Sequence, residues 1–530
     1  MRRFIPDESV DLCYIDPPFS SNRDFNQIYN NPSRKDIAQA KAFVDTWTWD
    51  NSAECSLHEI QINEGQRYTL KLFDFINGLE RILERGPLFA YLISMAMRVN
   101  EIYRVLKPTG TFYLHCDPTA SHYLKILLDT VFGVNNFRNE ITWKRSNPKS
   151  HISRNFPTCT DIILRYTKSN NYFYKQPYAE HDIEYVDSAY RYSDNNGRYR
   201  LLPLLNPNDN RPNLTYEFLG VMRVWRWEKS RMEKAYADGL VVQLKPGAVP
   251  QYKKYLHDSS GKTVTNCWVD IKPVSGNEAL GYPTQKPEAL LHRIISASSI
   301  EDDVVLDAYC GCGTTVAVAH RLNRRWIGID ITYQSISLII KRLEDTYGKE
   351  IINSLELSGV PKDFESARSL ALKPDDKTRK EFEKWSVLTY SNNRAMINEK
   401  KGSDKGIDAT IFIMGPKEEP QRVIFSVKSG KVQVSHVRDL RGTVEREKAA
   451  GGILITLSSP TSPMIQEAKS AGFIDNSLFS APLEKIKIVT VEEILSGARL
   501  QLPLAFDVVK SAKLDVKKSK QREIFDENEE

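Results

Sequence analysis

The chain has 530 residues, of which 41% are apolar and 27% are charged, and its formal net charge is +5. This composition is typical of a globular protein with several domains and excludes a chain that is disordered throughout. The sequence has no run of about 18 apolar residues, so no membrane span is expected. The seven cysteines are scattered and the first residues lack an apolar segment. These features predict a cytoplasmic protein without a disulfide framework or a secretory signal.

The N-terminal region alternates apolar strands and helices. A β-favouring run predicts a strand at 10–15, and the Asp-Pro-Pro sequence that follows ends it. A helix is expected at 88–105, and the segment 107–110, Lys-Pro-Thr-Gly, should separate it from the next strand. That strand is predicted at 111–115, and a further helix at 123–132.

Residues 191–255 differ from their surroundings. They contain twelve Lys or Arg against six Asp or Glu, and nine aromatic residues lie between them. Periodicity is weak, so this region is expected to form a separate small fold inserted in the chain.

A regular α/β pattern returns after residue 286. Helices are predicted at 287–298, 314–323 and 333–346, with strands at 304–306 and 326–329 between them. This alternation predicts a parallel sheet covered by helices on both faces. Further on, strands are expected at 409–413, 423–427 and 452–457, with a helix at 437–448.

A glycine-rich loop follows the strand at 304–306. The segment Asp307-Ala308-Tyr309-Cys310-Gly311-Cys312-Gly313-Thr314-Thr315 leads into a helix, which Thr314 and Thr315 are expected to cap. Asp330 follows the next strand, 19 residues after Gly311, a spacing typical of an acid that binds ribose hydroxyls. Asp307 would repel a pyrophosphate but attract a cation. The loop therefore favours a cationic nucleoside cofactor, S-adenosylmethionine, although alone it fits a tight turn about as well.

Asp16-Pro17-Pro18-Phe19 lies at the carboxyl end of the first strand, where open α/β sheets bind ligands. Asp16 and the Pro17 carbonyl could accept the two protons of an amino group on an aromatic base, and Phe19 could stack on that base. The alternative is a turn that ends the strand.

Together these motifs resemble those of the amino-methylating DNA methyltransferases. Asp16 to Phe19 is similar to their motif IV, Asp307 to Thr315 to motif I, and Asp330 to the motif II acid. The segment 282–287, with Thr284, Gln285 and Lys286, is similar to motif X. The catalytic motif precedes the cofactor motif, as in the β class. The resemblance implies a circularly permuted doubly wound α/β sheet in which Thr284, Gln285, Lys286, Asp307, Ala308, Gly311, Gly313, Thr314, Thr315 and Asp330 bind S-adenosylmethionine. This family usually has another strand and loop upstream of motif IV, so the start of this chain is expected to be shortened.

The resemblance extends to two other regions. The basic insert occupies the place of the target-recognition domain of this family, and its candidate DNA-binding residues are Arg198, Arg223, Arg226, Lys253 and Lys254. Trp225 and Trp227 are expected to face its core. The C-terminal region resembles the PD-(D/E)xK nuclease core, most closely Mrr-like restriction endonucleases, with Asp408 as metal ligand, Lys428 as catalytic partner and Glu383 as first-helix acid. Ser426 stands where that family has an acid or amide, so Mg²⁺ binding and cleavage are left open.

The sequence therefore predicts six regions: a catalytic half at 1–175, a target-recognition insert at 176–275, a cofactor half at 276–350, a linker at 351–375, a restriction-endonuclease-like domain at 376–500 and a charged tail at 501–530. The predicted activity is adenine-specific methylation of duplex DNA in a restriction-modification system. The alternatives are amino-cytosine methylation, methylation of RNA or a protein amide, and a DNA-binding protein with an inactive catalytic domain. A homodimer is left open.

Overall fold

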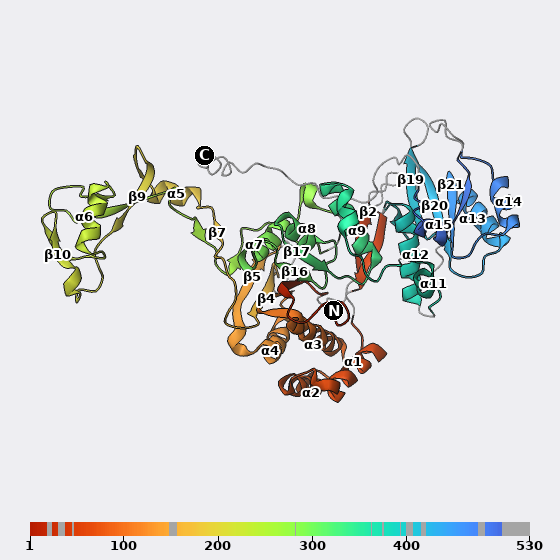
Figure 1. Cartoon of the computed structure of the whole chain (residues 1–530), viewed down its shortest axis with the longest axis horizontal. Coiled ribbons are helices and arrows are strands. Elements are labelled where there is room, and N and C mark those ends of the chain that lie inside the picture. Colours follow the sequence, from red (N-terminus) through yellow and green to blue (C-terminus); the bar gives the residue numbers. More distant parts are fainter. Residues whose placement is uncertain are drawn as a thin grey trace. The chain divides into compact units, whose positions relative to one another are not determined.

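The computed structural model describes residues 1–18, 24–29, 38–44, 47–147, 156–280, 282, 284–361, 363–373, 376–392, 394–398, 406–414, 420–474 and 483–500. The chain forms two compact units (Figure 1). One comprises Met1–Lys175 with Asn266–Glu530, and the other is Gln176–Thr265.

A mixed seven-stranded sheet organises the first unit. Its order is β15-β5-β6-β4-β1-β16-β17. Strands β4, β1, β16 and β17 run parallel, whereas β6 is antiparallel to both β4 and β5. The predicted α/β class with a parallel centre is therefore confirmed. The strands are β1 (Val10–Ile15), β4 (Leu106–Cys116), β5 (Phe137–Lys144), β6 (Thr160–Thr167), β15 (Cys267–Trp268), β16 (Val304–Asp307) and β17 (Arg325–Gly328).

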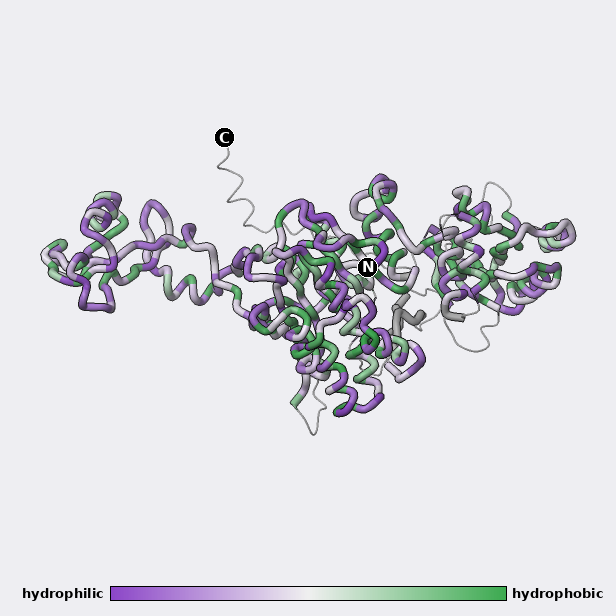
Figure 2. The backbone as a smooth tube through the Cα atoms, turned by 60° about the horizontal axis from the view of Figure 1, so that its bottom comes forward, coloured by the Kyte–Doolittle hydropathy of each residue, from purple (hydrophilic) through white to green (hydrophobic). Residues whose placement is uncertain are grey.

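Helices pack on this sheet because its strands are apolar on both faces. On one face, Phe112 and Leu114 of β4 share a buried core with residues of α1 to α4. Tyr113 points to the opposite face, as strand alternation requires, and its hydroxyl lies 2.7 Å from that of Ser298 in α7. Figure 2 shows green, hydrophobic stretches among the strands and helices of this part of the chain, alternating with hydrophilic ones. The helices between residues 51 and 371 of this unit are α1 (Asn51–Ile62), α2 (Leu70–Leu83), α3 (Pro87–Val105), α4 (Ser121–Phe132), α7 (Glu288–Ser298), α8 (Thr314–Arg321), α9 (Tyr333–Tyr347), α10 (Glu350–Ser354) and α11 (Phe364–Ala371). Of these, α11 packs in the core of the C-terminal part of the chain and not on this sheet.

One predicted boundary differs from the structure. The segment 107–110 was expected to end the preceding helix and to separate it from a strand at 111–115, yet β4 already begins at Leu106 and runs through this segment. The pairing with β1 jumps from Val10 opposite Leu106 to Leu12 opposite Thr111. The extra residues therefore form a bulge in the strand rather than an interruption, because a bulge accommodates unpaired residues without ending the sheet.

The unit Gln176–Thr265 has a small core of its own. Its four-stranded sheet has the order β12-β13-β9-β8, and β10-β11 and β14-β7 form two further pairs. Trp225 is fully buried and packs with Phe218 and Met232, as expected of a core tryptophan. The elements are β7 (Tyr178–Ala179), α5 (Ile183–Ala189), β8 (Tyr192–Asp194), β9 (Gly197–Pro203), β10 (Thr215–Phe218), β11 (Val221–Val224), α6 (Lys229–Ala237), β12 (Val241–Val242), β13 (Gln251–Tyr255) and β14 (Lys262–Thr263).

The C-terminal part of the chain contains a five-stranded sheet of order β18-β19-β20-β21-β22. β19 is antiparallel to β20, whereas β20, β21 and β22 are parallel. One buried cluster includes Trp385 and Phe425, and another includes Ile424 and Leu440. The elements are α12 (Asp376–Tyr390), β18 (Met396–Ile397), β19 (Ala409–Met414), β20 (Pro420–Lys428), α13 (Val434–Arg446), β21 (Gly451–Thr456), α14 (Ser462–Ser470), β22 (Ile486–Thr490) and α15 (Val491–Leu495).

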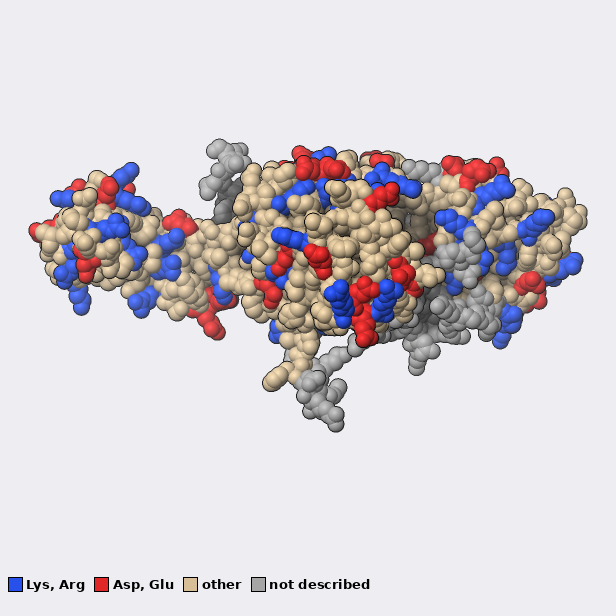
Figure 3. Space-filling view, turned by 90° about the horizontal axis from the view of Figure 1, so that it is seen from below, with Lys and Arg blue, Asp and Glu red and all other residues tan. Residues whose placement is uncertain are grey.

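Two further strands, β2 (Asp24–Tyr29) and β3 (Ala38–Val44), form an antiparallel pair after the first strand. Across the ranges that the structure describes, no helix is both long and apolar enough to cross a membrane. In the face shown in Figure 3, lysine and arginine are interspersed with aspartate and glutamate, so no extended surface of one charge is visible there.

Candidate active site

Three aspartates lie at the carboxyl ends of three neighbouring strands. Asp16 follows β1, Asp307 is the last residue of β16, and Asp330 comes two residues after β17. These strands are adjacent and parallel in the order β1-β16-β17. Their carboxyl ends therefore meet at one edge of the sheet, which is where ligands bind in open α/β folds. Burial raises the pKa of Asp307, and the charges of Asp16 and Asp330 at the same edge add to that rise.

Asp307 is buried at the start of the glycine-rich loop. Its Oδ2 accepts a hydrogen bond of 2.5 Å from the Thr315 hydroxyl, and its Oδ1 accepts one of 3.0 Å from the Tyr309 N–H. Burial nevertheless raises the pKa of Asp307 to about 7, because a charge is poorly solvated there. The site thus holds a carboxyl that a nearby cation would ionise.

Asp330 is tied to the same loop. Its Oδ2 accepts a hydrogen bond from the Gly311 N–H at 3.0 Å, and its Oδ1 accepts one from the Thr332 N–H at 3.0 Å. Burial raises the pKa of Asp330 as well. The predicted acid of this segment therefore lies beside the predicted glycine loop.

Two glycines give this loop its path. Gly311 and Gly313 have φ of +48° and +76°, which only glycine adopts readily. A Cβ on Gly313 would also lie 2.5 Å from Cγ1 of Ile339 in α9. Gly313, rather than a threonine, is the N-cap of α8, because Thr315 instead donates its hydroxyl to Asp307. Ala308 packs at the edge of the main core.

The predicted motif at 282–287 divides into structural and active-site residues. The Gln285 side chain accepts a hydrogen bond from the Leu280 N–H and donates one to the Glu278 carbonyl, so it fixes its own loop. Thr284 is exposed with φ of +64°. Lys286 is buried, and its ammonium contacts Oδ2 of Asp16. The pairing of Lys286 with Asp16 was not predicted, since 270 residues separate them.

Asp16 and the two prolines lie where the sequence placed them. Pro17 is buried and Pro18 is partly buried, directly after β1. Phe19 lies outside the described residues. The carboxylate and the rigid proline backbone therefore stand at the edge of the sheet that also holds Asp307.

A buried polar array lies beside this edge. The Tyr14 hydroxyl is 2.9 Å from Nδ1 of His115, and Nε2 of His115 is 3.0 Å from Oδ2 of Asp161. Burial opposes ionisation of Asp161, but the hydrogen bond from His115 and the charges of His115, Lys286 and Arg145 lower its pKa overall. Sequence analysis missed this array because its three members lie on separate strands, and only the sheet register brings them together.

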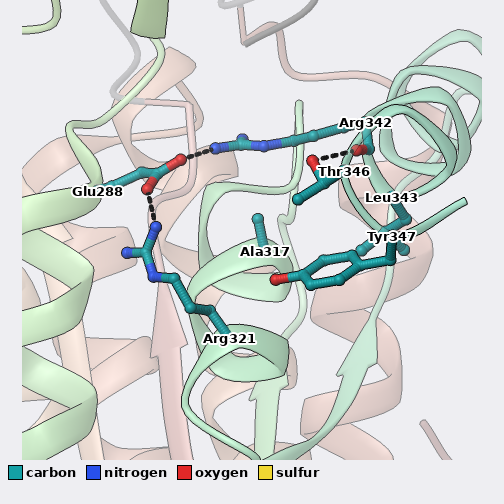
Figure 4. Close-up of a pocket in the computed structure, with 7 residues that line it drawn as sticks. All are labelled: Glu288, Ala317, Arg321, Arg342, Leu343, Thr346 and Tyr347. Carbon is teal, nitrogen blue, oxygen red and sulfur yellow. Dashed lines mark hydrogen bonds and ion pairs between the residues drawn. The ribbon is translucent and has the colours of Figure 1, made fainter. Parts of the chain in front are cut away.

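An ion-pair cluster anchors the segment that carries Lys286. Figure 4 shows Glu288, the first residue of α7, bound by Arg321 of α8 and Arg342 of α9. Burial opposes ionisation of Glu288, but the two guanidinium groups outweigh it and lower its pKa. Both arginines of this pocket are therefore engaged with Glu288, and their ion pairs join α7, α8 and α9.

The candidate DNA-binding residues of the unit Gln176–Thr265 fall into two groups. Arg198 donates to the Tyr190 carbonyl and pairs with Asp187, and Lys253 pairs with Asp194 at 2.7 Å, so both hold the fold of this unit together. Arg223 and Arg226 are exposed, although Nε of Arg226 donates to the Leu205 carbonyl. Lys254 is partly buried.

The C-terminal region brings the predicted nuclease-like residues together. Oδ2 of Asp408 accepts a hydrogen bond from the Val427 N–H at 2.6 Å, which holds it beside β20. Burial and the charge of Asp408 raise the pKa of Glu383 to about 7, and Lys428 is near enough to oppose this shift. Ser426 is buried in β20, on the same face as Lys428. Within the described residues, no group of three His, Cys, Asp or Glu side chains is arranged to hold a metal.

This fold and site define a class of α/β enzymes, and comparison with known proteins gives the family. Residues 10–341 match the model of the N6_N4_Mtase family, described as DNA methylase, and the chain belongs to this family. Residues 379–495 match a model described as NACHT-associated inactive Restriction Endonuclease 1. The C-terminal region is thus similar to restriction endonucleases that are described as inactive.

Individual relatives match over parts of their length. Type II methyltransferase M.EcaI of Enterobacter cloacae is 31% identical over 259 residues, which cover 48% of this chain and 57% of that protein. The StyLTI Mod subunit of a type III restriction-modification enzyme from Salmonella typhimurium is 26% identical over 337 residues, covering 60% and 47%. DNA adenine methyltransferase YhdJ of Escherichia coli is 41% identical over 117 residues, covering 20% and 38%. The chain spans about half the length of the first two.

Proposed function

We propose that this protein transfers a methyl group from S-adenosylmethionine to the exocyclic amino group of adenine in duplex DNA, as the modification enzyme of a restriction-modification system. One observation carries the proposal. In a member of the DNA methylase family, Asp16, Asp307 and Asp330 converge at one edge of the sheet, with the Asp-Pro-Pro motif directly after β1.

The charges of the site fit this cofactor. Three carboxylates lie near one another, and burial disfavours their ionisation at Asp307 and Asp330. A ligand with a sulfonium and an ammonium group would offset this negative charge, whereas a pyrophosphate would be repelled. Asp330 and the Gly311 to Thr315 loop would hold the nucleoside end, and Asp307 would face the cationic end. When bound, S-adenosylmethionine supplies an electrophilic methyl group that leaves sulfur as the target nitrogen forms the new bond.

The residues of the chain prepare the target nitrogen. The lone pair of an aromatic amino group is delocalised into the ring, so the nitrogen is a poor nucleophile. Asp16 and the Pro17 carbonyl accept hydrogen bonds from its two N–H groups. These bonds draw the nitrogen towards tetrahedral geometry and localise the lone pair on it. The negative charge of Asp16 also stabilises the positive charge that develops on nitrogen before it loses a proton.

Adenine is the favoured target for two reasons. Asp16 occupies the first position of a motif that has aspartate in adenine enzymes of the resembled class. In addition, the Escherichia coli relative with 41% identity is named as an adenine methyltransferase. The exposed Arg223 and Arg226 support contact of the unit Gln176–Thr265 with the phosphates and base edges of DNA.

The test is incubation of unmethylated duplex DNA with S-adenosylmethionine carrying a labelled methyl group, followed by mass spectrometry of the nucleosides. Labelled N6-methyladenine is expected. Label in amino-methylcytosine alone would overturn the choice of base but not the transfer reaction. Label in neither nucleoside would contradict the proposed activity.

For the C-terminal region we propose a DNA-binding, Mrr-like domain with weak or absent cleavage. The order of Glu383, Asp408 and Lys428 supports the nuclease-like arrangement, and Ser426 in place of an acid removes one metal ligand. The match to a family described as inactive supports the same conclusion.

A further inference from the structure

The contact between Lys286 and Asp16 joins the two halves of the site. The Lys286 side chain is only 9% exposed and the Asp16 side chain 16%. The ammonium contacts one carboxylate oxygen, Oδ2. A charge-assisted hydrogen bond in such a sheltered place fixes the orientation of both groups.

The other oxygen of Asp16 is in a different situation. Oδ1 is buried and has no hydrogen-bond partner within the described part of the chain. A buried carboxylate oxygen without a partner is unfavourable, and such exceptions in native folds call for a functional explanation. This atom is therefore a desolvated hydrogen-bond acceptor that is available to a donor on a bound ligand.

We propose that Lys286 is a positioning residue for methyl transfer, which holds Oδ2 of Asp16 so that Oδ1 is aimed at the amino group of the target base. This inference rests on the proposed function. It assigns Lys286 a role towards the target base, distinct from the cofactor binding that the motif at 282–287 predicts.

The surroundings of Lys286 support a fixed position. Two residues further on, Glu288 is bound by Arg321 and Arg342, so the start of α7 cannot shift easily. The positive charge of Lys286 also contributes to lowering the pKa of Asp161, which places its ammonium near a second carboxylate. The ammonium is thus buried beside Asp16 and not at the surface.

Aiming matters because only one geometry activates the nitrogen. An acceptor that is rotated away from the N–H direction gives a weaker hydrogen bond and leaves the lone pair in the ring. Misplacement of a reacting group by about 1 Å can cost on the order of 10²-fold in rate. Loss of the lysine should therefore slow the chemical step even though Asp16 itself remains.

The decisive experiment compares single-turnover rates of labelled methyl transfer to unmethylated duplex DNA at saturating S-adenosylmethionine. Lys286→Met should lower the rate by about 10²-fold, with the dissociation constant of S-adenosylmethionine changed by less than about 3-fold. Lys286→Arg, which keeps the charge, should recover part of the rate. In the Asp16→Ala background, Lys286→Met should cost little more, because its partner is already gone. A tenfold weaker cofactor affinity with an unchanged saturated rate would overturn the proposal and make Lys286 a cofactor ligand.

Lys341→Met provides a matched control. Lys341 is also a buried lysine paired with a carboxylate, at 2.8 Å from Asp345 one turn along α9. It should show the general cost of losing such a pair as a lowered melting temperature, with the methyl-transfer rate kept. An equal loss of rate in both variants would show that Lys286 acts through stability alone.

A readout without activity separates this inference from the proposed function. In the free full-length protein, the melting-temperature shifts of Lys286→Met and Asp16→Ala should be non-additive in the double variant, because each removes the same contact. Additive shifts would show that the contact does not exist in solution and would overturn the positioning role. Wild-type protein that methylates no base would instead refute the proposed function, whatever the stability cycle gives.

Discussion

The two parts of the molecule that resemble enzymes both gather carboxylates, but they differ in how many they gather and in the elements that supply them, since Glu383 of the nuclease-like region lies in α12. In the DNA methylase region, Asp16, Asp307 and Asp330 come from three adjacent strands. In the nuclease-like region, Asp408 and Glu383 lie together, and Ser426 stands where a third oxygen ligand would be expected.

This difference in the number of carboxylates indicates which kind of cation each site can bind. Burial raises the pKa of Asp307 and of Glu383 to about 7 in both cases. In the methylase region the charges of Asp16 and Asp330 add to that of the raised group, so an organic cation has several carboxylate partners. In the nuclease-like region a divalent metal would find two acids and a serine hydroxyl, a weak set for a hard cation. A shared pKa shift therefore does not imply a shared chemistry, and the following variants test that distinction.

The largest effect is expected for Asp16→Ala. Removal of the carboxylate deprives the target nitrogen of its acceptor and leaves its developing charge unstabilised, so kcat should fall by about 10²–10³-fold. S-adenosylmethionine should still bind, since Asp307 and Asp330 remain. Rate measurements check the expected fall in kcat, and titration calorimetry on the same preparation checks that S-adenosylmethionine still binds. A variant that turns over at the wild-type rate would remove Asp16 from the mechanism.

Asp330→Ala should act on the cofactor instead of the target. A carboxylate that holds ribose hydroxyls acts equally in the ground and transition states, so KM should rise with kcat nearly unchanged. Loss of a charged hydrogen-bond acceptor costs roughly 1.5–3 kcal/mol, which is about 10–10²-fold in affinity. The carboxylate also accepts from the Gly311 N–H, so some of this loss will reflect a looser loop. Unchanged affinity in calorimetry would place Asp330 outside the cofactor site.

Much of this site was readable from the sequence because the signals are local. The apolar runs of β1, β16 and β17 predicted each strand to within about one residue, and the acids that end them followed directly. The glycines at 311 and 313 were recognised because the turn requires positive φ. Such features depend on neighbours in the chain, which a single sequence displays.

The rest depends on contacts between distant segments. Nothing near residue 286 indicates that its lysine meets Asp16, and nothing near His115 indicates that it meets Asp161. Strand order alone could have placed these ends at one edge of the sheet, but not the individual atoms. The bulge in β4 was missed for a similar reason, since the segment Lys-Pro-Thr-Gly at 107–110 is typical of a turn unless the partner strand is known.

A smaller effect is expected from pH. Asp307 has a raised pKa of about 7 in the free protein, so its ionised fraction increases from roughly one tenth at pH 6 to nine tenths at pH 8. Because a cationic ligand binds the ionised form, S-adenosylmethionine should bind up to about tenfold more tightly at pH 8 than at pH 6. The free protein should change in the opposite sense, since a carboxyl whose pKa rises on folding favours the folded state less as pH rises through 7.

Asp307→Asn is the control for this dependence. It keeps an acceptor for the Thr315 hydroxyl but cannot ionise, so the difference in affinity between pH 6 and pH 8 that belongs to the protein should disappear. Calorimetry at both pH values measures it. An identical pH dependence in the variant would assign the titration to the ligand or to another residue.

The smallest effects are expected in the nuclease-like region, and they test the comparison from its other side. Wild type should nick supercoiled DNA weakly or not at all with Mg²⁺, because Ser426 adds no charge to Asp408 and Glu383. Asp408→Ala should leave methyl transfer unchanged and remove whatever Mg²⁺-dependent nicking exists. Ser426→Glu should strengthen Mg²⁺ binding, measured by calorimetry, if Asp408, Glu383 and residue 426 truly face one point. Equal nicking by wild type and Asp408→Ala would show that the cleavage does not come from this domain. A Ser426→Glu protein that remains folded but binds no more Mg²⁺ would show that this region has lost the geometry of a nuclease as well as its ligand.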